Sequence, residues 1–246
     1  MFKPCILIPV YNHEHAMPTM MARIAPLAVD CLLVNDGSNA DCSRVLQQLA
    51  AQYPRVTLIE HDHNQGKGAA FKTGLREAAA RGYSHVVQID ADGQHEVDDI
   101  PRFLALGQLN PAAIINGVAM YDETVPKLRQ YGRYITHFWV WVNTLSLSIR
   151  DSMCGFRLYP VASTLQLVNE ETIGNRMDFD SEILVRSHWR GIPIIALPTR
   201  VHYPLDGVSH FQALRDNAMI SLMHTRLFFF MLGRLPGWLL GRRRPG

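Results

Sequence analysis

The chain has 246 residues, of which 48 % are hydrophobic and 19 % are charged, so it can bury a sizeable core and general disorder is excluded. The formal net charge of +2 is too small to indicate binding to nucleic acid. The length suits one large domain, or one domain with a C-terminal appendage.

The first half of the chain alternates short apolar runs with segments of helical period. The apolar runs predict strands at Cys5–Pro9, Cys31–Val34, Val56–Ile59, His85–Ile89 and Ala112–Ile115. The segments between them predict helices at Glu14–Ala28, Ser43–Tyr53, Gly68–Arg81 and Val97–Leu106. Short strands that alternate with longer helices are typical of an α/β fold with a mostly parallel central sheet and right-handed crossovers.

The second half of the chain is less regular. It predicts one or two aromatic-rich helices at Leu128–Ile149, a short strand at Gly155–Tyr159, a helix at Phe179–Trp189, a strand at Pro193–Val201 and a long helix at Phe211–Leu232. No clear linker divides the chain. We therefore expect one domain over residues 1–210, followed by an amphipathic helix and a basic tail over residues 211–246.

Polar residues follow four of the predicted strands directly. They are Tyr11–Asn12 after the first strand, Asp36–Ser38 after the second, His61–Lys67 after the third and Asp90–Asp92 after the fourth. In an open parallel sheet, the ligand binds beyond the carboxyl ends of the strands. We therefore expect these four segments to meet at one binding site.

Asp90 and Asp92 are separated by one residue at the end of a predicted buried strand. Two carboxylates side by side repel each other unless a cation lies between them or one of them takes a proton. Hard oxygen ligands suit Mg²⁺ or Mn²⁺, and Mg²⁺ often binds one or two carboxylates together with substrate phosphates. Gln94 adds a neutral oxygen nearby. We predict a divalent cation held by Asp90, Asp92 and Gln94, which neutralises a diphosphate.

The cysteines and the N-terminal segment predict the compartment. Cys5, Cys31, Cys42 and Cys154 show no C-x-x-C spacing, and we expect reduced thiols that serve as small core residues. The segment MFKPCILIPVYN has too short an apolar run for a signal peptide. We therefore expect the chain to begin in the cytosol.

Five ordered stretches resemble inverting family 2 glycosyltransferases, especially the dolichyl- or polyprenyl-phosphate sugar synthases. They are IPVYN at Ile8–Asn12, VNDGS at Val34–Ser38, HNQGKGAA at His63–Ala70, DADGQH at Asp90–His95 and CGFRLY at Cys154–Tyr159. The resemblance runs from about Lys3 to Ser209. It implies a Rossmann-like GT-A fold, a UDP- or GDP-sugar donor, a divalent metal, and transfer to a membrane-associated lipid acceptor, either polyprenyl phosphate or a lipid hydroxyl.

The resemblance also implies roles for individual residues on the donor side. Donor nucleotide binding falls to Pro9, Tyr11, Asn12, Asp36, Lys67, Asp90 and Ala91. Asp36 would hydrogen-bond the base or ribose, and its structural alternative is an Asx turn. Lys67 would lie near the nucleotide or pyrophosphate, where its two glycine neighbours allow a close backbone approach.

The stretch NRMDFDSEIL, from Asn175 to Leu184, resembles the acidic motif near the reacting centre of the family. It makes Asp180, Asp178 and Glu182 the catalytic candidates, with Asp180 as a base that takes a proton from an acceptor hydroxyl. Asp178 and Glu182 are four residues apart and share a helical face. The alternative is that these acids cap the helix and complement its dipole.

Three arginines are candidates for binding the phosphate of the acceptor. Arg129 and Arg133 fall where related lipid-phosphate transferases place such residues, and Arg157 in CGFRLY is a further candidate. The alternative for Arg129 and Arg133 is that they are ordinary surface residues of a helix.

The stretch HYPLDGVSHF, residues 202–211, departs from the pattern of the polyprenyl-phosphate enzymes. Ser209 matches that pattern, but Pro204 stands about where an arginine is expected and His210 replaces a basic residue. Ser209 and His210 remain acceptor candidates. A lipid hydroxyl therefore stays open as the acceptor, and it would need Asp180 or Asp178 as a base.

The C-terminal tail mixes apolar and basic residues. The apolar run LFFFMLG lies between Arg226 and Arg234, and it is far shorter than the roughly 20 residues that span a bilayer. Apolar residues interleaved with arginines predict a segment at the surface of an anionic membrane, with the protein peripheral on its inner face. A packed terminal helix with a basic end is a compatible alternative.

Three other functions fit parts of the pattern. A sugar-nucleotidyltransferase also uses an acidic metal pair, but IPVYNHEH lacks the basic, glycine-rich phosphate loop that it would need after the first strand. A non-catalytic partner subunit would bind the nucleotide-sugar without transferring the sugar. A zinc hydrolase would use the pair His13 and His15 or the pair His61 and His63, and neither pair has an evident third ligand.

Overall fold

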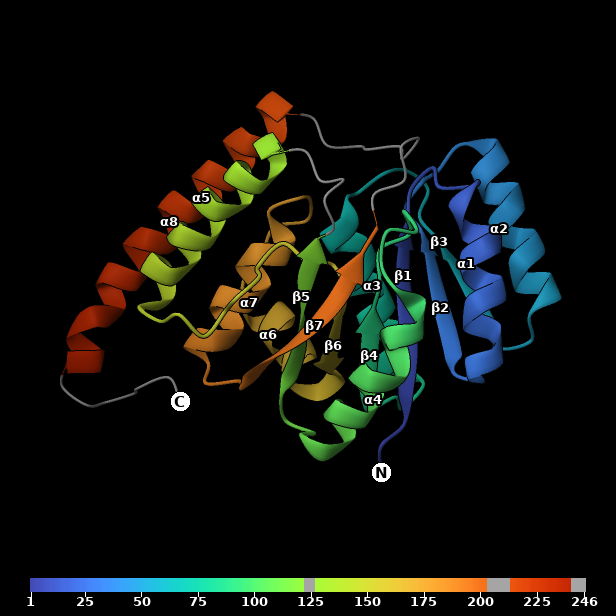
Figure 1. The fold of residues 1–246 in the computed structure, drawn as a ribbon, viewed down its shortest axis with the longest axis horizontal. Coiled ribbons are helices and arrows are strands. Elements are labelled where there is room, and N and C mark those ends of the chain that lie inside the picture. The colour runs from blue at the N-terminus through green and yellow to red at the C-terminus, as the bar shows by residue number, and fades with distance from the viewer. Residues whose placement is uncertain (122–126, 203–212, 240–246) are drawn as a thin grey trace.

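The computed structural model describes residues 1–121, 127–202 and 213–239. Its strands are β1 Pro4–Val10, β2 Asp30–Asn35, β3 Val56–Glu60, β4 His85–Gln88, β5 Ile114–Tyr121, β6 Arg157–Pro160 and β7 Ile194–Val201. In the described residues they form one seven-stranded sheet of order β3-β2-β1-β4-β6-β5-β7. Helices cover both faces of this sheet (Figure 1).

The sheet is mostly parallel, as predicted. β1 pairs in parallel with β2 and β4, β2 with β3, and β5 with β7. β6 departs from this direction, because it runs antiparallel to both β4 and β5. Its first residue, Arg157, therefore pairs with Gln88 at the carboxyl end of β4. This reversal brings the segment that precedes β6 to the edge where we predicted the binding site.

The α-helices are α1 Ala16–Ile24, α2 Ala40–Gln52, α3 Lys67–Ala80, α4 Ile100–Leu109, α5 Lys127–Thr144, α6 Val161–Glu170, α7 Phe179–Trp189 and α8 Ala213–Leu239. Short 3₁₀ turns follow α1 and precede α4, at Ala25–Leu27 and Val97–Asp99. The sequence analysis missed α6. This helix begins directly after Pro160, which is both the last residue of β6 and the N-cap of the helix, so no separate loop divides the two elements.

Alternate residues of the strands face two different cores. On β1, Cys5 and Leu7 join the cluster that packs against α3, α6, α7 and α8, whereas Ile6 and Ile8 join the cluster beneath α1, α2 and α4. A sheet buried on both faces needs continuous apolar strands, which is why CILIP gave so clear a strand signal. All four cysteines are buried and free.

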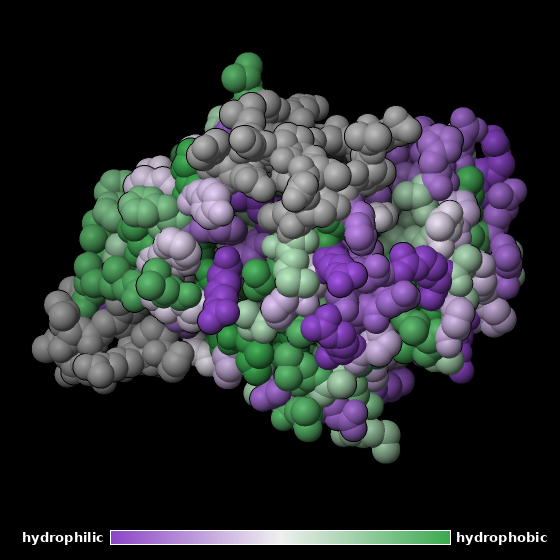
Figure 2. Space-filling model, viewed as in Figure 1, coloured by the Kyte–Doolittle hydropathy of each residue, from purple (hydrophilic) through white to green (hydrophobic). Residues whose placement is uncertain are grey.

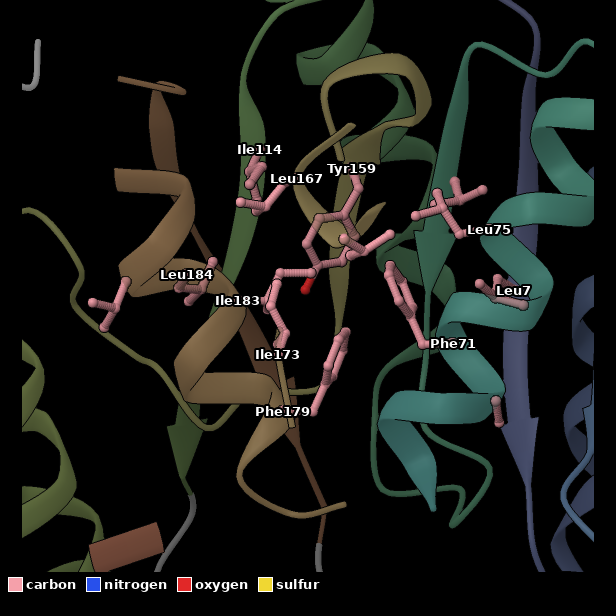
Figure 3. Close-up of a cluster of buried hydrophobic side chains, with 14 of the residues drawn as sticks. Leu7, Phe71, Leu75, Ile114, Tyr159, Leu167, Ile173, Phe179, Ile183 and Leu184 are labelled. Atoms are coloured by element: carbon pink, nitrogen blue, oxygen red, sulfur yellow. The ribbon is translucent and has the colours of Figure 1, made fainter. Parts of the chain in front are cut away.

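An aromatic cluster joins α3 to the first turn of α7. The ring centroids of Phe71 on α3 and Phe179 on α7 are 5.0 Å apart, and Phe71 lies equally close to Tyr159 of β6. Figure 3 shows these three rings facing one another across the core. Because every residue of α7 is buried, this packing fixes the positions of the acidic residues that α7 carries.

α8 packs against the core of the domain. Its residues Ile220, Met223, Leu227 and Met231 belong to the same core cluster as α3 and α7. α8 lies alongside α5 at one side of the molecule (Figure 1). Within residues 1–121, 127–202 and 213–239, no helix combines the length and the apolar character needed to cross a bilayer.

Candidate active site

A cavity of about 540 Å³ opens at the carboxyl edge of the sheet. The loops after β1, β2, β3 and β4 all contribute to its wall, as predicted. The segment that leads into α7 and the first turns of α8 complete the wall. Nine of the predicted site residues line the cavity, namely Pro9, Tyr11, Asp36, Lys67, Asp90, Ala91, Asp92, Gln94 and Asp180.

Lys67 links the two sides of this cavity. Its Nζ lies 2.7 Å from Oδ1 of Asp90 and 2.6 Å from Oδ2 of Asp180. Burial alone would lower the pKa of Lys67, but the two carboxylates outweigh burial and raise this pKa above its usual value. The ammonium group is therefore held in its charged form between a predicted metal ligand and a predicted catalytic acid.

Asp90 is held in a tight pocket. Burial opposes the ionisation of Asp90, but Lys67 and His95 outweigh it and keep the pKa of the Asp90 carboxyl below its usual range. His95 Nε2 lies 3.8 Å from Oδ2 of Asp90. A Cβ atom on Gly155 would lie only 2.0 Å from the same oxygen. Only glycine leaves room there, which gives the CGF part of CGFRLY a physical role.

The loop that carries Asp92 and Gln94 is tied to the end of β7. The backbone N–H of Gln94 donates to Oδ1 of Asp92 at 3.0 Å, and the carbonyl of Gln94 accepts from the N–H of His202 at 2.8 Å. The N–H of Glu96 also donates to the carbonyl of Arg200 at 3.3 Å. The predicted metal ligands thus lie on a loop with fixed backbone geometry.

The three predicted metal ligands form an oxygen-only set on the cavity wall. No group of three His, Cys, Asp or Glu side chains suited to a metal occurs among the described residues. Two carboxylates and one amide oxygen fit a cation such as Mg²⁺, which takes its remaining ligands from water and substrate phosphates. The donor set therefore suits a cation that binds together with a diphosphate, rather than a closed structural site.

Asp36 is 2 % exposed, and its carboxylate holds the loop between β3 and α3. Its two oxygens accept hydrogen bonds from His61 Nδ1, Asn64 Nδ2 and the backbone N–H groups of Gln65 and Gly66, at 2.8 to 3.0 Å. Four donors fill the capacity of a carboxylate. Asp36 thus lines the cavity while its side chain supports the loop that leads into Lys67.

Neither histidine pair forms a metal site within the described residues. Both ring nitrogens of His61 are engaged, Nδ1 with Asp36 at 2.8 Å and Nε2 with Thr73 Oγ1 at 2.9 Å. His13 lines the cavity, and His15 is exposed at the start of α1.

Asn12 connects the loops after β1 and β2 and is not part of the cavity lining. Its Oδ1 accepts from the N–H of Asn39 at 2.8 Å, and its own N–H donates to Ser38 Oγ at 3.1 Å. Its φ of 54° lies in the left-handed region, which asparagine tolerates better than most residues. Asn12 thus helps to shape the two loops at this edge of the cavity.

The three acidic candidates on and before α7 occupy different environments. Asp180 faces the cavity and also accepts from Gln88 Nε2 at 3.4 Å. Asp178 lies just before α7 with 9 % of its surface exposed, and burial, which is the largest influence, raises the pKa of its carboxyl. Glu182 is fully buried and outside the cavity lining.

Glu182 joins three segments of the chain. Its carboxylate accepts from Arg186 Nε at 2.8 Å, from Arg226 Nη2 at 2.7 Å and from the N–H of Gly174 at 2.9 Å. These partners belong to α7, to α8 and to the loop before α7. The structure therefore places Glu182 in a buried ionic network behind the cavity.

Two of the three arginine candidates, Arg157 and Arg133, are not among the residues that line the cavity. Arg157 is fully buried and donates to the carbonyls of Asp180 and Ser152 at 2.7 and 2.8 Å. Arg133 Nη2 donates to both carboxylate oxygens of Asp151, at 2.8 and 2.7 Å. Asp151 in turn accepts from the N–H groups of Met153 and Cys154.

Three predicted acceptor residues cannot be placed by their side chains. Arg129 belongs to α5, but its side chain lies outside the described residues. Ser209 and His210 lie outside the described residues altogether, as does the basic end of the tail, residues 240–246.

The structure adds cationic residues that the sequence analysis did not single out. Arg176 lines the cavity, and its Nη1 donates to Asn64 Oδ1 at 3.1 Å. Arg215 and Asp216 reach the cavity wall from the first turn of α8. Arg176 lies within the quoted stretch NRMDFDSEIL, two residues from Asp178, so its charge was a usable signal. Nothing local to α8 indicated that this helix borders the site.

The sequence matches a known family and known relatives. A model described as glycosyl transferase family 2 matches residues 5–167. The dolichyl-phosphate β-glucosyltransferase ALG5A of Trichomonas vaginalis is 26 % identical over 256 residues, which cover 97 % of this chain and 76 % of that protein. The undecaprenyl-phosphate mannosyltransferase of Micrococcus luteus is 26 % identical over 202 residues, which cover 78 % of this chain and 80 % of that protein.

Solved structures show the same fold. Glucosyl-3-phosphoglycerate synthase from Mycobacterium tuberculosis superposes with a TM-score of 0.64 at 16 % identity, over 95 % of this chain and 80 % of that chain. Mannosyltransferase PcManGT from Pyrobaculum calidifontis, in complex with GDP-Man and Mn²⁺, gives 0.62 at 15 % identity, over 90 % and 62 %. The fold is GT-A, as predicted. Because the family model spans most of the sheet and the loops that line the cavity, the chain belongs to glycosyl transferase family 2 and is a glycosyltransferase.

Proposed function

We propose that this glycosyltransferase moves a sugar, with inversion, from a UDP- or GDP-sugar to a membrane-associated lipid. One observation carries the proposal: Asp90 and Asp180 line the same cavity, and both lie within 2.7 Å of one ammonium group. An inverting transfer needs the leaving group and the acceptor on opposite sides of one sugar carbon. We assign Asp90, through the cation that it would hold, to the leaving group, and Asp180 to the acceptor.

The donor side would hold a Mg²⁺ or Mn²⁺ ion on Asp90, Asp92 and Gln94. When bound, such an ion acts as a Lewis acid that stabilises the departing nucleoside diphosphate. The oxygen-only set and the rigid loop fit this role. The solved relative with GDP-Man and Mn²⁺ supports a divalent cation in this fold.

Cationic side chains of the chain itself would bind the phosphates of the donor. Lys67, Arg176 and Arg215 all reach the cavity wall. Asn64 lies in the loop that leads to Lys67. It donates a hydrogen bond to Asp36 and accepts one from Arg176, so it ties this loop to the segment that carries Arg176. Pro9, Tyr11 and Asp36 line the side of the cavity where the nucleoside would lie. Orienting the reactants in this way is the main contribution we assign to the protein.

Asp180 is our candidate for handling the acceptor. A lipid hydroxyl must lose a proton as it attacks, and Asp180 is the candidate base that lines the cavity. A lipid phosphate is already ionised at neutral pH, so Asp180 would then orient the acceptor and Lys67. Names of relatives that contain dolichyl phosphate and undecaprenyl phosphate support a polyprenyl phosphate.

The lipid acceptor implies contact with a membrane, and α5 and α8 offer a surface for it. Large apolar side chains on this helix pair are exposed, namely Tyr134, Ile135, Phe138, Trp139, Leu222, Phe229 and Phe230. Figure 2 shows hydrophobic residues gathered over the side where the two helices lie. Together with the arginines of the C-terminal segment, they support peripheral binding at the inner face of the cell membrane.

The donor is tested first, by a thermal-shift panel of UDP, GDP and their sugars with and without Mn²⁺. A ligand that binds only the folded protein raises its stability in proportion to the logarithm of its concentration over Kd. We expect one nucleotide to stabilise the protein more strongly with Mn²⁺ than without it. No stabilisation by any member of the panel would contradict the proposed donor class.

Transfer is tested next, with the preferred donor labelled in its sugar and with polyprenyl phosphate or free polyprenol as acceptors. We expect label in the lipid fraction, a complete loss with Asp92→Asn, and full activity with the control Asp41→Asn on the surface of α2. With a hydroxyl acceptor, Asp180→Asn should lower the rate by about 10²- to 10⁴-fold. Donor binding by the wild type without transfer to either lipid would favour a non-catalytic subunit.

A further inference from the structure

The ammonium group of Lys67 lies where a divalent cation bound to Asp90 would come close to it. Its Nζ contacts one carboxylate oxygen of Asp90, which is also a proposed metal ligand. The other contact of Nζ, with Asp180, holds the ammonium group between the two carboxylates. The side chain of Lys67 is only 18 % exposed, so water weakens these contacts little. Lys67 therefore already neutralises part of the charge that a divalent ion would neutralise.

The backbone around Lys67 holds it in this place. Gly66 has a φ of +102°, and a Cβ atom on it would lie 2.2 Å from the carbonyl oxygen of Asn175. A Cβ atom on Gly68 would lie 2.7 Å from the side chain of Phe179. The N–H of Ala69 donates to the same Asn175 carbonyl at 3.2 Å. The start of α3 is thus pressed against the segment that carries Asp180.

From this geometry we infer that Lys67 is a resident counter-ion, which holds Asp90 and Asp180 together until the donor arrives and then yields its place on Asp90 to the divalent cation. This inference rests on the proposed function. A divalent ion bound to Asp90 would lie within a few ångströms of the Lys67 ammonium, and the two cations repel each other. The metal alone should therefore bind weakly.

The diphosphate of the donor removes this conflict. Its negative charges can neutralise both the divalent ion and the displaced ammonium group, which can remain on Asp180 or bind a phosphate oxygen. Metal and nucleotide should therefore bind cooperatively, and by thermodynamic linkage each should raise the affinity for the other by the same factor. Lys67 would make metal binding conditional on the presence of the donor.

The test measures Mn²⁺ binding to the full chain, from the electron paramagnetic resonance signal of free Mn²⁺. The titration is done with Mn²⁺ alone and with Mn²⁺ plus UDP or GDP, whichever stabilises the wild type. Lys67→Met and Lys67→Gln remove the charge, and glutamine keeps a hydrogen-bond donor between the carboxylates. Lys67→Arg keeps the charge. Arg44→Met, which removes a cation on the surface of α2, controls for the change in net charge.

We expect the two neutral variants to bind Mn²⁺ alone at least about tenfold more tightly than the wild type, and to gain less affinity when the nucleotide is added. Lys67→Arg and Arg44→Met should both remain close to the wild type. Unchanged affinity for Mn²⁺ alone in the neutral variants would overturn the inference, provided that the wild type binds Mn²⁺ tightly with nucleotide.

Two further outcomes would also overturn the inference. If the wild type binds no Mn²⁺ even with nucleotide, the proposed metal dependence fails, and the inference fails with it. If both neutral variants lose their fold, as judged by circular dichroism and thermal unfolding, Lys67 is a structural counter-ion rather than an exchangeable one.

Discussion

Gly155 shows how one residue can set the position of a reactive group. The space that its missing side chain leaves is filled by the carboxylate of Asp90. We predict that Gly155→Ala displaces Asp90 from Lys67 and lowers kcat by at least about tenfold, because a shift of about 1 Å at a reacting centre can cost up to a hundredfold. The rate of sugar transfer at saturating donor measures this effect.

The matched control for this substitution is Gly233→Ala on α8. Apart from the chain neighbours and backbone of its own helix, no atom lies within 4 Å of a Cβ atom at Gly233. Alanine is favoured over glycine inside a helix by up to about 1 kcal/mol, so the control should keep full activity and unfold at the same or a slightly higher temperature. Equal activity losses in the two variants would contradict the role assigned to Gly155.

The sequence could predict which residues near the strand ends line the cavity, but it could not predict the roles of residues buried behind the cavity. Asp90 and Lys67 were found because a parallel sheet gathers its carboxyl ends in one place. Glu182 belongs to the same acidic stretch as Asp180, but its partner Arg226 is 44 residues away in the chain. No local pattern shows which acid of such a stretch meets a distant arginine. Only the folded arrangement separates a structural carboxylate from one that faces the cavity.

At the scale of elements, Glu182 joins α7 to α8. We predict that Glu182→Gln lowers the free energy of unfolding by about 1.5 to 3 kcal/mol, because, within the described residues, buried Arg186 then keeps only Glu171 as an ionic partner and Arg226 loses its charged one. Denaturant unfolding measures this loss. At a temperature low enough for Glu182→Gln to remain folded, this variant should keep most of the wild-type kcat, since Glu182 does not reach the cavity. A large loss of kcat with unchanged stability would instead support a catalytic role.

The docking of α8 also predicts a pH dependence. His224 is buried against Asn143, with 4 % of its surface exposed, and burial lowers its pKa to about 4. The unfolded chain, with a histidine pKa near 6.5, takes up a proton that the folded chain refuses. The stabilising contribution of neutral His224 is therefore complete above about pH 6.5 and is lost as the pH falls towards 4.

His224→Gln tests this dependence. The variant should lose less stability than the wild type between pH 6.5 and pH 4, by up to about 3 kcal/mol. Urea unfolding at several pH values measures the difference, and His15→Gln, which removes an exposed imidazole, serves for comparison. Parallel curves for the wild type and His224→Gln would contradict the proposed linkage.

Most elements of the sheet could be predicted from the sequence, and the exceptions have physical causes. The strands that are buried on both faces, such as β1 and β2, gave continuous apolar runs. The direction of β6 had no signal of its own, because a short strand of four residues carries no mark of parallel or antiparallel pairing. The contribution of α8 to the cavity could not be predicted either, since it depends on how the helix packs.

At the scale of the whole molecule, the proposed function links the cavity to the exposed face of α5 and α8, which is proposed to meet the lipid. We predict that Phe138→Glu and Phe229→Glu each weaken binding to vesicles of anionic phospholipid, because each places a charge on the face proposed to meet the lipid. Co-sedimentation with the vesicles measures binding. Leu109→Glu on α4 is the control, since it replaces an even more exposed apolar residue away from this helix pair.

The outcome separates two accounts of this surface. If the helix pair meets the membrane, its two variants should lose vesicle binding while Leu109→Glu keeps it, and transfer to lipid should fall with binding. If all three variants bind like the wild type, the apolar face has another purpose.

The central claim is that Asp90 and Asp92 share one cavity with a divalent cation and the diphosphate of a nucleotide. Crystals of the full chain grown with Mn²⁺ and UDP or GDP, with anomalous diffraction recorded for manganese, test it most directly. We predict an anomalous peak bonded to the carboxylates of Asp90 and Asp92 and to phosphate oxygens, with Lys67 withdrawn from Asp90. A nucleotide bound elsewhere, or a Lys67–Asp90 pair that persists without manganese beside it, would contradict the account.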